Sequence, residues 1–466
     1  MTIPALTGRV TGRSITLVVF ETVLIVLAIA AAAYVRLGMR SAEAFLQDGG
    51  VTRILIVAVI LQGSLYFADL YNLRVLADRR ELFTRLVHAM AATSFILAAL
   101  YFWLPALIIG RGVIMVATLF VIALVLGWRL TFEWTSRRVR ARERLLLVGT
   151  SAAAVDLARE MFERRHELGV EIVGFVDPDP LRVGAPVLNP GVIGTVDDIP
   201  SIVRARAVDR VVVSLADARG KLPVDKLLEM KLEGVTFDHL ASVYEEYTGK
   251  IAVENLRPSW LIFSPGFKKS ALLSATKRLL DVVLAGVGLV LALPIMAVVA
   301  LAIRLTSTGD VFYHQRRVGQ HGRIFTVHKF RSMHPDAEAA TGPVWASKDG
   351  DPRVTPIGAL LRRTRLDELP QLLNVLKGDM SFVGPRPERP EFVADLTRQI
   401  PFYGQRHIVR PGLTGWAQVR YTYGATVEDA LQKLQYDLFY IKNLSLALDL
   451  FIIVATVKTV VMRKGA

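Results

Sequence analysis

Four long apolar runs open the sequence and constrain its fold more than any other feature. They cover approximately residues 15–35, 54–70, 86–107 and 113–130. Each run is close to the roughly 20 apolar residues that a membrane-spanning helix needs. The chain is also 52% hydrophobic, which is too apolar for a soluble enzyme of 466 residues. We therefore predict four transmembrane helices within residues 1–136, the first of them an uncleaved signal anchor.

Arginines between these runs predict how the runs cross the membrane. They gather before the first run, between the second and third, and after the fourth: Arg9 and Arg13; Arg74, Arg79, Arg80 and Arg85; Arg137, Arg138, Arg140, Arg142 and Arg144. Cationic loops stay in the cytoplasm, so the N-terminus and everything after Arg137 are expected there. The net charge of +14 suits an anionic lipid surface or phosphorylated substrates, and no nucleic-acid partner is expected.

Glu21 lies inside the first apolar run. An acid in such a segment is either functional or satisfied by facing the interior of the helix group or the membrane interface. We favour the second interpretation.

Residues 137–255 have the pattern of a soluble α/β domain. Apolar strands are expected at 145–149, 170–176 and 210–215, with a helix at 152–165. This alternation predicts a parallel, doubly wound, Rossmann-like sheet. A dinucleotide fingerprint needs three glycines after the first strand, but the chain has Gly149, Ser151 and Ala154, although Asp177 stands where a ribose-binding acid would lie. We favour a structural or regulatory domain over a working NAD site and assign it no cofactor.

Residues 256–276 form a candidate linker. The prolines and aromatic residues between Arg257 and Lys269 are typical of a segment at the membrane surface or of aromatic packing between domains.

The next apolar stretch, residues 279–305, is long enough to span a bilayer but contains Pro294. Proline removes a helical hydrogen bond and crowds the preceding turn. An ordinary kinked span would place the rest of the chain outside the cell. We favour a re-entrant helix-hairpin broken at Pro294, with its basic ends (Lys277 and Arg278, and Arg304) at the cytoplasmic headgroups.

An adjacent carboxylate pair, Asp367 and Glu368, lies within Arg363–Leu373. Leucines at helical spacing follow it and Gly378 ends the run, so the pair is expected at the mouth of a short helix. In one interpretation Asp367 is an N-cap and Glu368 complements the helix dipole. In the other, the two carboxylates hold a divalent metal and attack phosphorus at a helix mouth that attracts phosphate.

Four segments around this pair combine a cation with glycine, proline or an aromatic residue: Phe312–Gly319, Phe325–Met333, Ser381–Pro387 and Arg410–Gln418. Each alone is compatible with a solvated loop. Together with the acidic pair they provide what a diphosphate-and-metal site requires, because arginine forks bind phosphate oxygens in pairs. His314, His328 and His407 lack metal-ligand spacing and are expected to be structural or to contact substrate.

The C-terminus is expected to be helical. Leu431, Leu434, Leu438 and Ile441 line one helix face, and residues 444–462 are apolar except for Asp449 and Lys458. These two charges favour an amphipathic helix on the membrane surface over a fifth span, anchored by Arg463 and Lys464.

The motifs after residue 277 together resemble one family. The matching segments are Lys277–Asp281, Gln315–Gly319, Lys329–Met333, Leu366–Leu372, Gly378–Pro387 and Arg410–Trp416. They are similar to the bacterial sugar transferases, the monotopic polyprenyl-phosphate hexose-1-phosphate transferases. Residues 1–255 resemble the four-helix and Rossmann-like extension of the large members of this family. Pro258–Phe263 resembles a subgroup linked to exosortase-associated exopolysaccharide loci.

The resemblance implies a multidomain membrane protein: a four-helix transmembrane bundle, the Rossmann-like domain, and a mainly α catalytic domain (277–466) with the re-entrant hairpin and interfacial helices. It implies that Asp367 attacks a UDP-sugar, releasing UMP, and that undecaprenyl phosphate then takes the sugar-phosphate, beginning an exopolysaccharide, capsule or O-antigen repeat unit. Asp367 and Glu368 would hold Mg²⁺. The expected phosphate-binding residues are Arg386, Lys329, Arg331, Gln315, Arg316, Arg410 and Pro385. The enzyme would work at the cytoplasmic face of the bacterial inner membrane, in contact with the bilayer, with a homodimer as a further expectation.

Two rival functions stay open. A membrane-tethered nucleotide-sugar epimerase or dehydratase would need a glycine fingerprint and a Tyr-x-x-x-Lys pair, and neither is well placed between Arg144 and Lys250. A non-catalytic assembly scaffold would not need the acidic pair and the arginine segments, which are all present.

Overall fold

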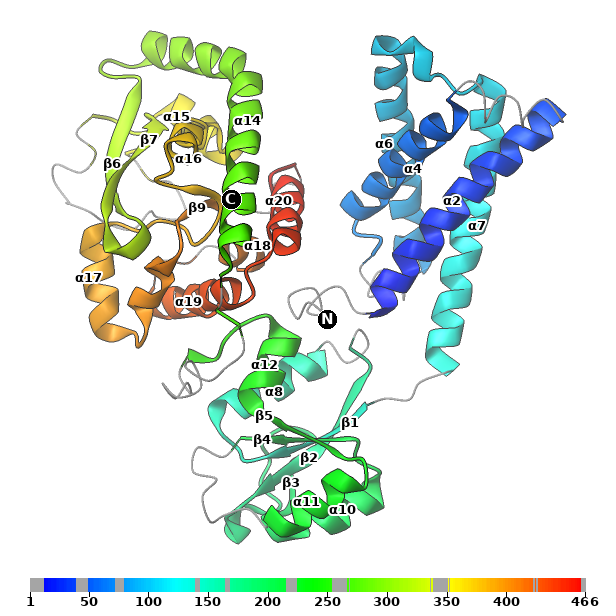
Figure 1. Ribbon diagram of the computed structural model, residues 1–466, viewed down its shortest axis with the longest axis vertical. Helices are drawn as coiled ribbons and strands as arrows, with labels where there is room; N and C mark the ends of the chain where they lie inside the picture. Colours follow the sequence, from blue (N-terminus) through cyan, green and yellow to red (C-terminus); the bar gives the residue numbers. More distant parts are fainter. Residues whose placement is uncertain are drawn as a thin grey trace. The chain divides into compact units, whose positions relative to one another are not determined.

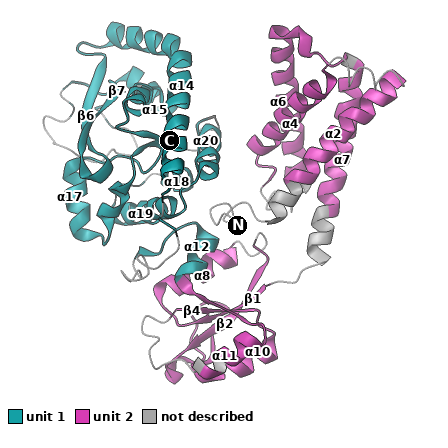
Figure 2. Cartoon of the chain, in the orientation of Figure 1, with its two compact units in different colours: residues 1–5, 241–466 teal, residues 6–240 magenta. Residues whose placement is uncertain are grey.

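The computed structural model describes residues 12–38, 49–71, 79–138, 143–163, 168–214, 224–253, 266–267, 269–335, 337, 351, 353–421, 424 and 426–461. These residues fall into two compact units, one within residues 6–240 and one within residues 241–466 (Figure 2). The expected linker at 256–276 and the tail residues Arg463 and Lys464 lie mostly or wholly outside the described residues.

The first unit begins with four apolar helices: α2 (Gly12–Leu37), α4 (Gly50–Phe67), α6 (Arg79–Trp103) and α7 (Arg111–Arg138), with a short 3₁₀ turn, η2 (Pro105–Leu107). All four are long and apolar enough to cross a membrane, as is a fifth helix in the second unit. They share one buried core, to which they contribute Ile25, Leu61, Leu86 and Val121. Figure 1 shows the four helices grouped together. The chain is a membrane protein.

Glu21 of α2 and Arg129 of α7 form a fully buried ion pair in this group. Arg129 Nη2 lies 2.8 Å from Glu21 Oε2, and its Nη1 donates to the carbonyl of Leu70. A charge away from water needs such a partner. The prediction that Glu21 faces the interior is confirmed.

The second part of this unit is a five-stranded parallel sheet. Its strands β1 (Glu143–Val148), β2 (Val170–Asp177), β3 (Val192–Thr195), β4 (Arg210–Val213) and β5 (Thr236–His239) lie in the order β3-β2-β1-β4-β5. Helix α8 (Ala152–Glu163) lies on one face, and α10 (Ile199–Arg206) and α11 (Val224–Leu232) lie on the other (Figure 1). Short turns η3 (Pro180–Arg182) and η4 (Val196–Asp198) complete it. Strand β1 is buried and apolar from Leu145 to Val148, because both faces of the sheet are covered there. The parallel α/β domain is confirmed.

Helix α12 (Leu240–Thr248) marks an earlier boundary than residue 255. Glu245 of this helix accepts hydrogen bonds from Lys442 (2.5 Å) and Asn443 (2.8 Å). Ile251 N donates to the carbonyl of Gln435. Residues 241–253 therefore belong to the C-terminal unit.

One helix of 36 residues, α14 (Ala271–Thr306), opens the rest of the second unit. It runs through Pro294 without interruption but turns sharply before it reaches β6 (Figure 1). Because proline is the usual cause of such a bend, we attribute the turn to Pro294. The expected break into two helices is thus a bend within one helix.

The basic residues at the start of α14 contact the protein. Lys277 Nζ lies 2.7 Å from Asp449 and 3.1 Å from the carbonyl of Val383. Arg278 donates to the carbonyls of Val375 and Leu376 at 2.7 Å each. Lys277 and Arg278 are thus engaged within the domain, and their position at the lipid headgroups stays a prediction.

The remaining elements form a mixed α/β unit with two small sheets. An antiparallel hairpin joins β6 (Phe312–Val318) and β7 (Ile324–Phe330) around η6 (Gln320–Gly322), and β8 (Ser381–Val383) pairs in parallel with β9 (Gly412–Thr414). The helices and turns are α15 (Pro356–Thr364), η7 (Leu366–Glu368), α16 (Gln371–Lys377), α17 (Pro390–Gln399), η8 (Tyr403–Ile408), α18 (Trp416–Arg420), α19 (Val427–Lys442) and α20 (Leu446–Val461). Trp416, Phe439 and Tyr440 are buried in the hydrophobic core of this unit.

Helix α20 has Asp449 on its buried side, whereas the sequence predicted this charge on the membrane surface. Asp449 is buried, pairs with Lys277 and accepts a 2.8 Å hydrogen bond from Tyr440. The exposed side of the helix instead carries Leu450, Val454, Val457 and Val460. In the sequence, Asp449 indicated a helix on the membrane surface. In the structure it pairs with Lys277 of α14 inside the unit.

Candidate active site

Asp367 and Glu368 lie in η7, a single 3₁₀ turn between α15 and α16. Arg365 precedes them in the left-handed backbone region, with φ of 56°, and so ends α15 and starts the turn. Neither η7 nor α16 has a side-chain hydrogen bond at its N-cap. The capping interpretation of Asp367 is therefore wrong, whereas Gly378 closes α16 with φ of 95° as expected.

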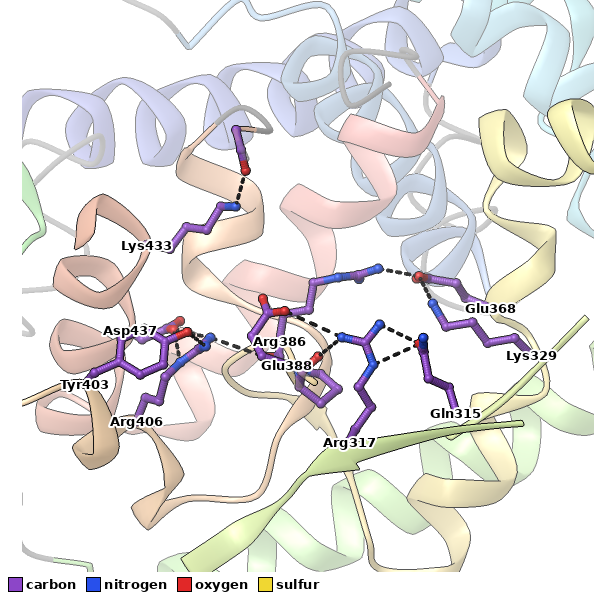
Figure 3. Close-up of polar contacts among 12 residues, drawn as sticks. Gln315, Arg317, Lys329, Glu368, Arg386, Glu388, Tyr403, Arg406, Lys433 and Asp437 are labelled. Atoms are coloured by element: carbon purple, nitrogen blue, oxygen red, sulfur yellow. Dashed lines mark hydrogen bonds and ion pairs between the residues drawn. The ribbon is translucent and has the colours of Figure 1, made fainter. Parts of the chain in front are cut away.

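Glu368 is held by two cations from separate segments. Lys329 Nζ, on β7, lies 3.1 Å from Glu368 Oε1, and Arg386 Nη2, just after β8, lies 2.6 Å from the same oxygen (Figure 3). The structure thus brings together four predicted site residues, including Asp367. Charge-assisted hydrogen bonds of this kind fix a carboxylate strongly.

Burial and these cations have opposite effects on Glu368. Burial alone would raise its pKa, but the charges of Arg386 and Lys329 outweigh it and hold the pKa of Glu368 well below its usual value. Burial lowers the pKa of Lys329, and Glu368 opposes that effect. Glu368 is consequently a permanent anion at neutral pH.

Asp367 has no hydrogen-bond or ion-pair partner among the described residues, although it is only 8% exposed. Burial, followed by the neighbouring charge of Glu368, raises the pKa of Asp367 to about 6, with Lys329 and Arg386 acting in the opposite direction. A carboxylate with this pKa is mostly ionised at pH 7 yet more basic than an ordinary aspartate. Higher basicity and the absence of a competing partner both favour nucleophilic attack.

The segment that carries Arg386 is held by close backbone contacts. Gly412 N donates to the carbonyl of Pro385 at 2.8 Å. A Cβ atom at Gly384 would lie 2.4 Å from the carbonyl oxygen of Arg410, so only glycine fits there. Pro385 therefore shapes this segment through its backbone.

The β6 strand places Gln315 and Arg317 on one face and Arg316 on the other. Arg317 donates to Gln315 Oε1 (2.6 Å) and to the carbonyl of Pro387 (2.9 Å), and it lies 3.5 Å from Glu388 (Figure 3). Arg316 is exposed and is not brought to the carboxylates. Sequence reasoning missed Arg317, which strand alternation with Gln315 would have indicated.

Two other predicted residues lie apart from the carboxylates. Arg331 is buried and donates to Ser307 Oγ at 2.7 Å, which braces the end of α14. Arg410 is half-buried beside Gly384 and has no hydrogen bond or ion pair among the described residues.

The three histidines have other surroundings. The Nδ1 atoms of His314 and His328 lie 2.9 Å apart across the β6–β7 hairpin. Burial and then Arg406 lower the pKa of His407 to about 4, so it is neutral at pH 7.

The donor set for a metal ion is small. Among the described residues, no group of three or more His, Cys, Asp or Glu side chains is placed to hold a metal. At the candidate site, Asp367 and Glu368 provide two carboxylates. Two carboxylates fit Mg²⁺, which usually completes its shell with water and substrate phosphates.

In the sheet domain, the acid in the ribose position is engaged. Asp177 Oδ2 accepts from Thr150 at 2.6 Å and lies 3.6 Å from Arg182. Ser151, where the fingerprint has glycine, lies 2.5 Å from Ser214 Oγ. Asp177 and Ser151, at the carboxyl edge of the sheet, are therefore already engaged in contacts within the domain.

Comparisons with known proteins agree with the motifs in the C-terminal unit. The sequence profile described as bacterial sugar transferase matches residues 272–463, and the profile described as CoA-binding domain matches residues 66–229. A UDP-glucose:undecaprenyl-phosphate glucose-1-phosphate transferase of Xanthomonas campestris pv. campestris is 35% identical over 70% of this chain and 68% of its own length. The chain belongs to the bacterial sugar transferase family.

Two further relatives extend this comparison. One is a UDP-N-acetylgalactosamine-undecaprenyl-phosphate N-acetylgalactosaminephosphotransferase of Aeromonas hydrophila. It is 43% identical over 49% of this chain, and the match covers 53% of its own length. The exopolysaccharide production protein PSS of Rhizobium leguminosarum bv. phaseoli is 43% identical over 39% of this chain and 92% of its own length. The prediction of a sugar-phosphate transferase is confirmed at the level of the family.

Proposed function

We propose that this bacterial sugar transferase moves a sugar-1-phosphate from a UDP-sugar to a polyprenyl phosphate, undecaprenyl phosphate, and releases UMP. The observation that carries the proposal is the contrast within η7. Asp367 is a buried carboxylate of raised pKa without a polar partner among the described residues, whereas Glu368 beside it is fixed by Lys329 and Arg386. One acid is thus suited to attack and the other to organise charge.

In the first step, an Asp367 oxygen attacks the β-phosphorus of the UDP-sugar. The bond from that phosphorus to the bridging oxygen breaks, and UMP leaves with the oxygen. The product on the enzyme is a sugar-phosphoryl aspartate. No general base is needed, because the attacking carboxylate is already ionised.

In the second step, a phosphate oxygen of the polyprenyl phosphate attacks the same phosphorus. The bond to Asp367 breaks, the carboxylate is restored, and polyprenyl-diphosphate-sugar leaves. The covalent intermediate lets two large anions use one site in turn, which spares the site from holding both charges at once.

Arg386 and Lys329 would balance the charge that develops on the transferred phosphoryl group. Both already contact Oε1 of Glu368. Mg²⁺ bound by Asp367, Glu368 and substrate phosphate oxygens would neutralise diphosphate charge and assist the leaving group. Arg317 and Arg410 are the further cations that we place near the nucleotide or the acceptor.

The sugar is a hexose whose identity the relatives leave open, since one is named for glucose and another for N-acetylgalactosamine. We propose that the product begins a repeat unit of an exopolysaccharide, capsule or O-antigen. The similarity to the Rhizobium exopolysaccharide production protein supports the first of these.

We further propose a bundle of α2, α4, α6 and α7 that crosses the inner membrane, with the sheet domain and the C-terminal unit in the cytoplasm. Helix α14 would enter and leave the cytoplasmic leaflet through its bend, and the apolar side of α20 would lie in the same leaflet. This arrangement brings the catalytic unit to the plane of the acceptor phosphate. Homodimer formation through residues 1–255 is part of the same proposal.

The test uses membranes containing the full-length protein, undecaprenyl phosphate, and a panel with UDP-glucose, UDP-galactose and UDP-N-acetylgalactosamine. We expect UMP from at least one sugar, only with Mg²⁺, and a radiolabelled sugar on the lipid. Omitting the lipid acceptor should leave a single turnover of UMP and a label on the protein. Transfer of label without UMP release would contradict the proposal.

A further inference from the structure

A second charged cluster is connected to the carboxylate site through Arg386. Arg406 of η8 and Asp437 of α19 form an ion pair whose side chains are 4% and 2% exposed. Arg406 Nε and Nη2 lie 3.1 Å and 2.8 Å from Asp437 Oδ2, and Arg406 Nη1 donates to the hydroxyl of Tyr403 at 2.7 Å. The guanidinium is thus engaged along its whole edge.

Arg406 also contacts the segment that carries the active-site cation. Its Nη2 donates to the backbone carbonyl of Arg386 at 3.1 Å (Figure 3). The side chain of Arg386 then reaches Glu368 at 2.6 Å. One buried guanidinium therefore connects α19 to the residue that holds Glu368.

Stability alone does not account for this arrangement. A buried ion pair contributes little relative to apolar side chains of the same volume, because removing two charges from water is costly. The hydrogen bond from Arg406 to the Arg386 carbonyl fixes the backbone at Arg386, which an apolar pair cannot do. Only a planar guanidinium donates to Asp437, Tyr403 and this carbonyl at the same time.

We propose that Arg406 and Asp437 are positioning residues for the transfer reaction, which fix the backbone at Arg386 so that its guanidinium stays on Glu368 and the transferred phosphate. This inference rests on the proposed function. Asp437 orients Arg406, and Arg406 holds the Arg386 carbonyl. A small displacement of such a group costs about 10²-fold in rate, because charge stabilisation depends on geometry.

The first test replaces the pair by apolar residues in one variant, Arg406→Met with Asp437→Leu. We expect membrane yield and thermal midpoint close to wild type, and kcat for UMP release lower by about tenfold or more, with a smaller change in KM. Arg406→Lys is the second variant; it keeps the charge opposite Asp437 but cannot reach all three acceptors. It remains informative if the double variant fails to accumulate.

A double-mutant cycle with Arg386→Ala separates positioning from general damage. If Arg406 acts through Arg386, Arg406→Lys should lower kcat strongly in the wild-type background and by less than about twofold in Arg386→Ala. An equal factor in both backgrounds would overturn the proposal. The matched control is the exposed pair Arg398 and Asp395 of α17, where Arg398→Gln should change neither rate.

Hydrogen–deuterium exchange gives a readout that needs no activity. Peptides covering residues 384–388 should exchange faster in the Arg406 variants than in wild type, with peptides from α16 unchanged. Unchanged exchange at 384–388 would overturn the positioning role even if wild-type protein released no UMP. Absence of UMP release by wild type, with faster exchange in the variants, would instead remove the proposed function alone.

Discussion

Arg386 donates a 2.6 Å hydrogen bond to Glu368, whereas Asp367, the next residue in the same turn, has no such partner among the described residues. Two adjacent acids thus have opposite electrostatic states. The pKa of Glu368 is held well below its usual value and that of Asp367 is raised to about 6. Environments that separate two carboxylates in this way are typical of sites where they have different tasks.

Asp367→Asn should abolish UMP release, by on the order of 10⁴-fold or more, because an amide cannot form the phosphoryl bond. Glu368→Gln should reduce the rate by about 10²-fold and still allow labelling of the protein by substrate. Protein-bound label is measured after quenching in acid. Labelling of the Asp367→Asn variant would assign the nucleophile elsewhere.

The rate should fall on the acid side of about pH 6, since only ionised Asp367 attacks and its pKa is raised to about 6. The quantity to measure is kcat/KM for the UDP-sugar, which reports the free enzyme and, in a two-step covalent scheme, excludes the acceptor phosphate. We expect a decline of about tenfold per pH unit below the midpoint. A profile that stays flat down to pH 4.5 would contradict this assignment.

Arg317→Gln should lower kcat/KM by about tenfold, because Arg317 lies with Gln315 and Glu388 beside the Arg386 segment. Arg316→Gln, one residue away but exposed on the other strand face, should change it by less than about twofold. Both are measured at saturating Mg²⁺. If kcat/KM falls further in Arg316→Gln than in Arg317→Gln, the β6 face that carries Arg317 is not the one that lines the site.

Asp310→Cys tests the topology of α14, and the natural chain has no cysteine to interfere. This exposed position follows α14, so a re-entrant helix leaves it in the cytoplasm. An impermeant maleimide should label it in inverted vesicles and not in intact cells. Gly110→Cys, between α6 and α7, is the positive control for labelling from outside. Labelling of Asp310→Cys in intact cells would establish an ordinary span.

The sequence predicted the parts of this molecule that depend on local patterns. Long apolar runs indicated α2, α4, α6 and α7, and strand–helix alternation indicated the parallel sheet. The pair Asp367 and Glu368 was identifiable because two adjacent acids, together with arginine-containing segments, are what a diphosphate-and-metal site requires. Helix α19 followed from its leucine spacing.

The remainder depends on contacts between distant residues. Lys277 and Asp449 are 172 residues apart, so the sequence could not show that each compensates the other. The β6–β7 hairpin was not predicted, because each of its two segments combines cations with aromatic residues and is also compatible with a solvated loop; Arg317 was missed with it. Arg406 and Asp437 are likewise brought together only by the packing of η8 on α19.

The first turns of α14 are as much a part of the catalytic unit as of the lipid-facing helix. Asp281, inside α14, accepts hydrogen bonds from Ser381 Oγ (3.0 Å) and Phe382 N (2.9 Å), directly before the segment of Arg386. Trimming this helix to obtain a water-soluble fragment would strip β8 of its support and leave Asp449 buried without its cation. Detergent-free handling of this enzyme should therefore preserve the helix and supply it with lipid, as in nanodiscs, instead of cutting it away.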